Sequence, residues 1–229
     1  MAALLGMAAM LSLGFWQLSR AAQKEALQAA ISERKSLPAL ANGTFLAIKN
    51  VADAAYSPVL LRGRWLPEHT VYLDNRQMQG KAGFYVLTPL ALEEGVVVVV
   101  QRGWVQRDFA QRDRLPAIET PQGTVQVAGR IAPPPAKLYE FSGSSAGVIR
   151  QNLDLGEFSA QTRLLLRQDL SVQQMGTASE GLLRDWPEVG SGVEKHYGYA
   201  FQWFALAALI AFLYVWFQFV VPRRKSRRA

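Results

Sequence analysis

His196 is a lone histidine at the start of a long apolar run, within the segment KHYGYAFQWFALA that covers residues 195–207. If this segment is helical, positions 196, 199, 200, 203 and 207 share one face. Polar groups at membrane depth are costly and tend to face a partner or a binding site. Imidazole is also a common axial ligand of haem iron. The residue types therefore indicate a candidate cofactor-binding site built from His196, Tyr199, Gln202 and Trp203.

The first apolar run of the chain ends in a similar set of side chains, GFWQ at residues 14–17. If the two runs form helices that pack together, Trp16 and Gln17 meet His196 on the same side of a membrane. A second interpretation stays open at this point. Trp and Tyr gather at membrane interfaces as an aromatic belt, and a boundary histidine can simply cap a helix or contact headgroups.

Other chemistry has less support in the sequence. The two histidines, His69 and His196, are far apart, and no HExxH or paired-histidine pattern exists. The chain has no cysteine, which excludes disulfides and thiolate metal sites. A hydrolase would need His69 and a serine such as those in FSGSSAG at residues 141–147. That segment matches no nucleophile motif and is typical of a flexible turn.

Two uncharged runs, residues 1–18 and 197–221, must position the candidate site. At about 1.5 Å per residue, each is long enough, or nearly so, to cross a hydrocarbon core of about 30 Å. We therefore predict transmembrane helices at residues 1–19 and 196–221. The alternative for the first run is a cleaved signal peptide, but the basic residues that usually open such a peptide are missing.

The net charge of +7 is concentrated at the C-terminus. Five basic residues and no acidic ones follow Val221, whereas residues 20–195 are nearly balanced. A basic cluster directly after a span is the positive-inside signal. We therefore expect residues 222–229 to be a cytoplasmic tail of a protein that spans the lipid bilayer. The N-terminus should also be cytoplasmic, and residues 20–195 should lie on the other side of the membrane. This distribution argues against nucleic-acid binding.

The middle of the chain is predicted to be a β-rich domain. Residues 20–36 are typical of a solvated helical stalk, and from about Val59 short strands are separated by Gly, Pro, Asn and Asp. A loop at residues 93–95 should join two of them. The five valines at residues 96–100 cannot alternate between core and water, so their strand should be central. A short helix over residues 154–162 and a last strand over residues 163–173 should follow.

This pattern predicts an α+β membrane protein with two transmembrane helices flanking a mostly antiparallel, barrel-like extracytoplasmic domain at residues 20–195. Near the end of the valine strand, Arg102-Gly103-Trp104 indicates either a bulge with a packed indole or a contact surface.

Four segments, taken in order, resemble the Surfeit locus protein family of cytochrome c oxidase assembly factors, in its bacterial type. They are GFWQLSRAAQK, VYLDNRQMQGKAGFYVLTPL, VVVQRGWVQ and KHYGYAFQWFALA. The resemblance covers nearly the whole chain and includes the same two-span topology. One departure is Gln101, which stands where the family often has asparagine before Arg-Gly-Trp.

The resemblance implies a role in building haem-copper oxidase, at or near insertion of haem a into the catalytic subunit, rather than an enzymatic reaction. It implies His196 as the haem iron ligand. Expected partners are the oxidase catalytic subunit and other oxidase assembly factors, with haem a synthase as a further candidate, in the bacterial inner membrane. The other cofactor-binding residues would be Tyr199, Gln202, Trp203, Trp16 and Gln17.

Two alternatives to this function stay open at the level of the sequence. The first is a membrane scaffold that stabilises the oxidase subunit without binding haem, in which case His196 matters only through packing. The second is a membrane-anchored periplasmic hydrolase, for which His69 and a serine would be essential and His196 dispensable.

Overall fold

The computed structural model describes residues 1–108, 110–111, 115–139, 147–187 and 192–221 of the 229-residue chain. The chain divides into two compact units. A helical unit contains residues 1–32 together with the region from residue 188 onward, and a β-rich unit contains Glu33–Pro187.

Two helices, α1 (Ala2–Lys35) and α5 (Val193–Val215), carry the apolar runs, and α5 continues into a π-helical turn, η3 (Trp216–Val220). Both helices are long and apolar enough to cross a membrane. The stalk prediction is confirmed, because α1 continues without interruption to Lys35. Helix α1 ends before Pro38, as expected for a residue that restricts the backbone ahead of it.

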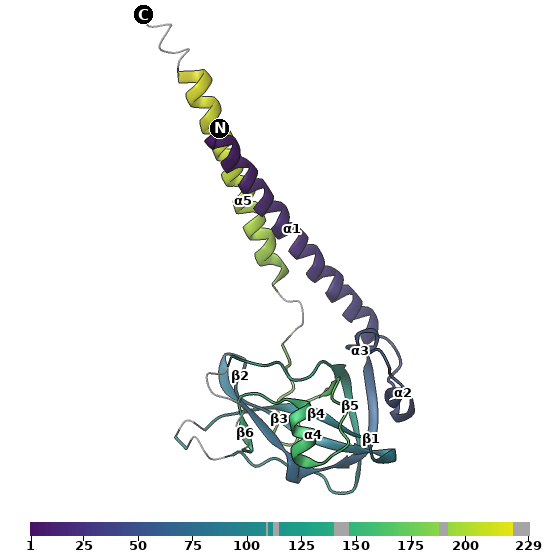
Figure 1. The fold of residues 1–229 in the computed structure, drawn as a ribbon. Coiled ribbons are helices and arrows are strands. Elements are labelled where there is room, and N and C mark those ends of the chain that lie inside the picture. The colour runs from purple at the N-terminus through teal and green to yellow at the C-terminus, as the bar shows by residue number, and fades with distance from the viewer. Residues whose placement is uncertain (109, 112–114, 140–146, 188–191, 222–229) are drawn as a thin grey trace, which may run out of the picture. The chain divides into compact units, whose positions relative to one another are not determined.

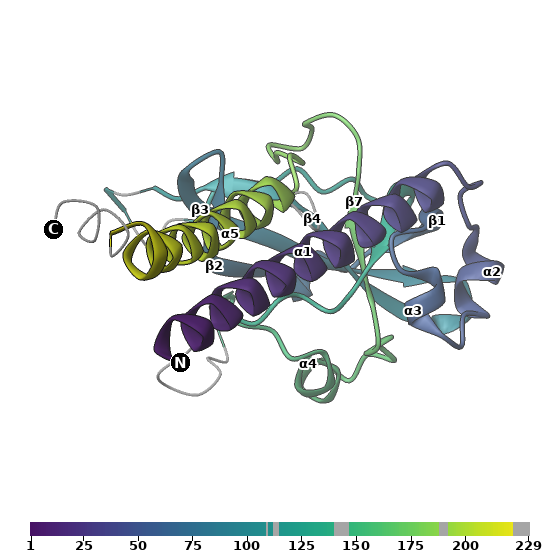
Figure 2. The ribbon, with the colours of Figure 1, turned by 90° about the horizontal axis from the view of Figure 1, so that it is seen from above.

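Helices α1 and α5 lie side by side and run in opposite chain directions (Figures 1 and 2). Small residues face the partner helix. A Cβ atom on Gly14 would lie 2.6 Å from the ring of Phe204, so a larger residue here would have to displace that ring. The Phe204 ring also packs edge-on against Phe15, with 5.3 Å between ring centroids. Close backbone approach at small residues is the usual way in which apolar helices associate.

The β-rich unit is built on a closed five-stranded barrel, as the sequence predicts. The strands follow the order β1-β5-β7-β4-β3, and β3 pairs again with β1. Strands β2 and β6 extend the sheet beyond β3. The pairs β4–β7 and β2–β6 are parallel, and the other pairs are antiparallel. The bounds are β1 Pro58–Trp65, β2 Val71–Met78, β3 Lys81–Leu92, β4 Val97–Gln106, β5 Thr124–Ala132, β6 Ile149–Arg150 and β7 Ser171–Gln174.

The valine strand is central and covered on both faces, which confirms its prediction. Val98 and Val100 point into the barrel core, together with Phe45 of the short helix α2 (Asn42–Leu46). Val97 and Val99 point to the other face, where Phe158 of α4 (Leu155–Thr162) covers them. Strand β4 is continuously apolar because each face of the sheet at this strand is covered by a separate hydrophobic core.

The short elements of the β-rich unit agree only in part with the sequence predictions. The connection at residues 93–95 is a short 3₁₀ turn, η2 (Glu93–Gly95), between β3 and β4, as expected. The last strand was predicted over residues 163–173, but β7 contains only Ser171–Gln174. Leu164 and Leu166 pack into the second core instead, after α4 ends at Arg163 with a left-handed backbone. Helices α2 and α3 (Val51–Ala54) and the 3₁₀ turn η1 (Pro67–His69) were not predicted.

Candidate functional site

His196 lies in the first turn of α5 and contacts the other helix of the pair through a hydrogen bond. Its Nδ1 atom lies 2.7 Å from Oε1 of Gln17 on α1. The two residues are 179 positions apart in the chain, and the pairing of the helices brings them together. The sequence predicted that Gln17 and His196 would meet if the helices pack, and the structure places them in contact.

A second polar contact joins the helices beside the first one. The hydroxyl of Tyr197 donates a hydrogen bond of 2.9 Å to Oε1 of Glu25 in the stalk of α1. Sequence reasoning missed this pair, because a charged stalk residue and a tyrosine next to the site have no local pattern in common. The signal that could have revealed it is the position of Glu25, about two helical turns beyond Gln17.

The remaining predicted site residues lie at different depths. Trp203 is partly buried, as is His196. Tyr199 is 52% exposed and Trp16 is 51% exposed, and the Gln202 side chain is also exposed. The buried residues of α5 are Val193, Ala200 and Ala207, and Tyr199 is not among them. A role of Tyr199 in cofactor binding stays a prediction.

Trp16 contacts a basic residue of its own helix. The guanidinium carbon of Arg20 lies 5.7 Å from the centroid of the Trp16 ring, which is a cation–π contact. Arg20 also donates a hydrogen bond of 3.1 Å to Gln23. Such a pair of an aromatic ring and a basic side chain is typical of the end of a membrane-spanning helix segment.

The residues present fit a haem ligated by one imidazole. Within the part of the chain that the structure describes, the only hydrogen bond of the His196 ring is the one from Nδ1 to Gln17, and Nε2 has none. A neutral imidazole with its proton on Nδ1 has its lone pair on Nε2. Among the described residues, no group of three or more His, Asp or Glu side chains could hold a metal ion. The described residues therefore present one imidazole at this place and no cluster that could cage a metal ion.

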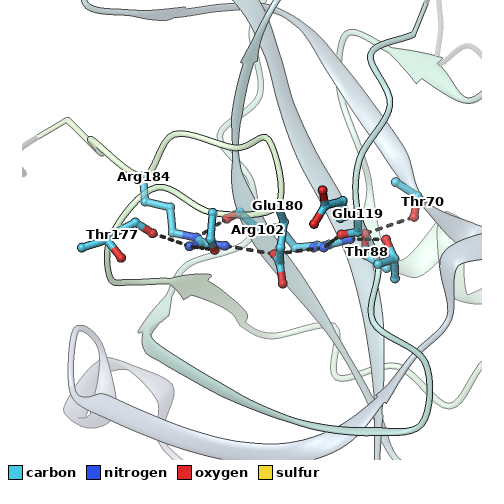
Figure 3. A network of polar contacts seen from close by, with 9 residues as sticks. Thr70, Thr88, Arg102, Glu119, Thr177, Glu180 and Arg184 are labelled. Carbon is cyan, nitrogen blue, oxygen red and sulfur yellow. Dashed lines mark hydrogen bonds and ion pairs between the residues drawn. The ribbon is translucent and has the colours of Figure 1, made fainter.

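The β-rich unit contains a separate buried polar centre at Arg102 (Figure 3). Its fully buried guanidinium group donates hydrogen bonds to the carbonyl of Glu119 at 2.6 Å and to Oγ1 of Thr120 at 2.7 Å. It forms an ion pair of 3.0 Å with Glu180, and it lies 4.8 Å from the ring centroid of Trp65. The network therefore ties two loops to strand β4.

Arg184 completes this network from the opposite side of Glu180 (Figure 3). It pairs with the same carboxylate oxygen at 3.0 Å, and its Nε atom donates to the carbonyl of Arg102 at 2.9 Å. Burial lowers the pKa of Arg184, and the neighbouring carboxylate of Glu180 opposes this shift. An arginine side chain still stays charged under these conditions, so one carboxylate is shared by two cations.

The alternative of a packed bulge at Arg102-Gly103-Trp104 is the one that the structure shows. The pairing of β3 with β4 shifts register between Val86 and Leu87, opposite Arg102. A Cβ atom on Gly103 would lie 2.7 Å from Leu182 Cβ and from the Leu183 carbonyl oxygen. Trp104 is 2% exposed and donates from Nε1 to a backbone carbonyl at 2.9 Å. These residues hold the fold together.

His69 lies apart from these groups, in the turn η1, with Nε2 4.0 Å from Oε1 of Glu68. A pocket of about 460 Å³ lies beside it and is also lined by Arg150 and Phe158. The serines of residues 141–147, which a hydrolase reaction would require, lie outside the described residues. The described residues therefore place no serine in the lining of this pocket.

Comparison with known proteins places the chain among related sequences. Residues 4–208 match the model of the SURF1 family. A SURF1-like protein of Rickettsia bellii is 26% identical over 212 residues, which cover 88% of this chain and 83% of that protein. A SURF1-like protein of Rickettsia felis is 33% identical over 109 residues, which cover 46% of this chain and 44% of that protein.

A yeast relative carries a functional name. The cytochrome oxidase assembly protein SHY1 of Saccharomyces cerevisiae is 26% identical over 102 residues. This match covers 44% of the chain and 26% of the yeast protein.

Proposed function

The chain belongs to the SURF1 family, and from this premise we propose that it is an assembly factor for cytochrome c oxidase that carries haem a through His196. The assembly role is supported by the family match over residues 4–208 and by the name of the yeast relative. The haem role is supported by one observation of the structure, the hydrogen bond from His196 to Gln17. That contact occupies Nδ1 and leaves Nε2 without a partner in the described part of the chain.

In this proposal haem a is a cargo, and its iron accepts a lone pair from the imidazole. Helices α1 and α5 hold the His196 ring at the start of the apolar run. Trp203 lies about two helical turns further along α5 and is partly buried, so it can flank a planar ring system. Tyr199, Gln202 and Trp16 expose their side chains away from the helix contact, where they can meet the haem or the receiving subunit.

A single imidazole on an exposed helix surface suits transfer better than storage. His196 is only partly buried, and its only ring hydrogen bond within the described residues is to Gln17. Removing one axial ligand is then sufficient to release the cargo. We propose the oxidase catalytic subunit as the receiver, with other assembly factors and haem a synthase as further partners.

The proposed location is the bacterial inner membrane, with both termini in the cytoplasm and the β-rich unit in the periplasm. Two helices of sufficient length and apolar composition support the membrane part of this proposal. The five basic residues after Val221 support the orientation, because cytoplasmic flanks are enriched in Lys and Arg.

The function is tested by deleting the gene in its host and restoring it with the wild-type chain, His196→Ala or His69→Ala. We expect the deletion to lower the amount of oxidase that contains haem a in the membranes. The wild-type chain and His69→Ala should restore it, whereas His196→Ala should not, although it accumulates to the same level. Full restoration by His196→Ala would support a scaffold without haem, and failure of His69→Ala alone would support the hydrolase alternative.

A further inference from the structure

We propose that Gln17 is a positioning residue that fixes the tautomer of His196, so that the lone pair of Nε2 is always available to a ligand. This inference rests on the proposed function for its biological meaning, since it explains how His196 is prepared for haem iron. It assigns Gln17 a different role from the one expected from the sequence, where it was grouped with residues that contact the cofactor.

The orientation of the Gln17 amide assigns the proton of the ring. The oxygen Oε1 of Gln17 lies 2.7 Å from Nδ1 of His196, and the role of Nδ1 in this contact depends on the tautomer. With the amide oxygen as the acceptor, we assign the proton to Nδ1. In a neutral imidazole the other nitrogen then has no proton. Nε2 is therefore the nitrogen that can bind a metal.

The surroundings of both side chains keep this contact in place. Gln17 lies on α1 between Gly14 and Ala21, which are both buried. His196 lies on α5 between Val193 and Ala200, which are buried as well. The two partly buried side chains thus meet at the end of the helix contact where α5 begins. A polar pair in apolar surroundings has few alternative partners, which favours one fixed arrangement.

A fixed tautomer has two consequences for ligation. An imidazole that donates from one ring nitrogen to an oxygen acceptor is oriented by it and becomes a stronger metal ligand. Loss of such a partner typically lowers metal affinity about 10- to 100-fold. Gln17 therefore influences haem binding through His196 without contacting the haem.

The test is a measurement of ring nitrogen shifts by NMR on the full chain in detergent, with ¹⁵N-labelled histidine. The chain has only two histidines, so a His69→Gln background leaves the signal of His196 alone. The spectra are recorded over a range of alkaline pH, and those with the nitrogen shifts of a neutral ring are compared. We expect the wild type to show a protonated Nδ1 and an unprotonated Nε2.

Three variants separate the tautomer from general packing. Gln17→Met keeps the length of the side chain but has no strong acceptor, so the ring should change to a mixture of both tautomers. Gln17→Glu keeps an oxygen acceptor and should retain the proton on Nδ1. Gln218→Met changes an exposed glutamine in η3, at the other end of the same apolar segment, and should leave the ring unchanged.

A haem a titration of the same proteins gives the second readout. Gln17→Met should bind about 10- to 100-fold more weakly than the wild type, and Gln17→Glu should bind more tightly than Gln17→Met. A wild-type ring with its proton on Nε2, or a ring that Gln17→Met does not change, would overturn the inference even if haem binds. A proton on Nδ1 in a wild type that binds no haem would support the inference and contradict the proposed carrier function.

Discussion

Arg102 and His196 each bring a polar group into apolar surroundings, but their neighbours give them different roles. The guanidinium group of Arg102 has no exposed surface and is bound by two loops, a carboxylate and an indole ring. The ring of His196 is bound at one nitrogen only, as far as the chain is described. The contacts of Arg102 join parts of its own fold, so we assign it a structural role, although its buried Nε atom has no hydrogen-bond partner among the described residues. The ring of His196 keeps a nitrogen that can coordinate a metal, so it is a candidate site.

The structural role of Arg102 leads to a prediction about stability. Arg102→Leu should lower the free energy of unfolding of the β-rich unit by about 3 kcal/mol, because it removes one partner of a buried ion pair. This loss of stability should lie at the lower end of the range that is usual for breaking a buried ion pair, since Arg184 still neutralises Glu180. Urea denaturation of the full chain in mild detergent, followed by tryptophan fluorescence, measures this change.

Arg62 on β1 supplies the matched control, because its side chain is exposed. Arg62→Leu should change the unfolding free energy by no more than about 0.5 kcal/mol. Equal losses in the two variants would show that the buried network does not stabilise the barrel.

At the scale of single elements, helix α4 depends on the residue that precedes it. The carboxylate of Asp154 accepts hydrogen bonds from the backbone N–H groups of Gly156 and Glu157, at 3.0 and 3.1 Å, and from Lys137 at 2.8 Å. The hydrogen bond from Lys137 and those from the backbone lower the pKa of Asp154. Asp154→Ala should therefore destabilise the β-rich unit by about 1 kcal/mol at neutral pH.

The pH dependence of this effect follows from the direction of the shift. The pKa of Asp154 is lower in the folded chain than its ordinary value of about 3.9, so its contribution is fully present above that value. The contribution is lost as the pH falls through the folded pKa. The stability difference between wild type and Asp154→Ala should thus shrink in acid, and Asp154→Asn, which keeps a capping oxygen, should lie between them. A difference that is independent of pH would contradict the assigned cap.

Elements with a strong local pattern could be predicted from the sequence, and the others could not. Consecutive valines in a strand require two covered faces, and the four valines at the start of β4, residues 97–100, are buried on both faces of the sheet. The leucines after Arg163 look equally like a strand, yet packing into the second core leaves only Ser171–Gln174 in β7. Helix α2 is too short to show a periodic pattern, although its Phe45 is completely buried in the barrel core.

In the candidate site, too, some features could be predicted from the sequence and others could not. A histidine and a glutamine in apolar runs could be recognised from their type alone, and they form a hydrogen bond. The exposure of the Tyr199 side chain could not be predicted from the sequence. It depends on which small residues of α5 are buried. The pair of Glu25 and Tyr197 could not be predicted either, since it depends on how the two helices are aligned.

At the scale of the whole molecule, the orientation in the membrane can be tested directly. The chain has no cysteine, so single cysteines can be introduced at Gln122, exposed in the β-rich unit, and at Ser226 in the basic tail. In spheroplasts, a thiol reagent that cannot cross membranes should label Gln122→Cys but not Ser226→Cys. After lysis it should label both. Labelling of Ser226→Cys before lysis would mean that the charge distribution does not set the orientation.

The most direct test of the carrier function is the optical spectrum of the purified protein. The wild type, His196→Ala and His196→Phe are isolated in detergent from cells that make haem a, at matched abundance and with matched folding. We predict a haem a spectrum in the wild type that is lost in both variants. A wild type without haem despite ample supply, or haem that persists in both variants, would contradict ligation by His196.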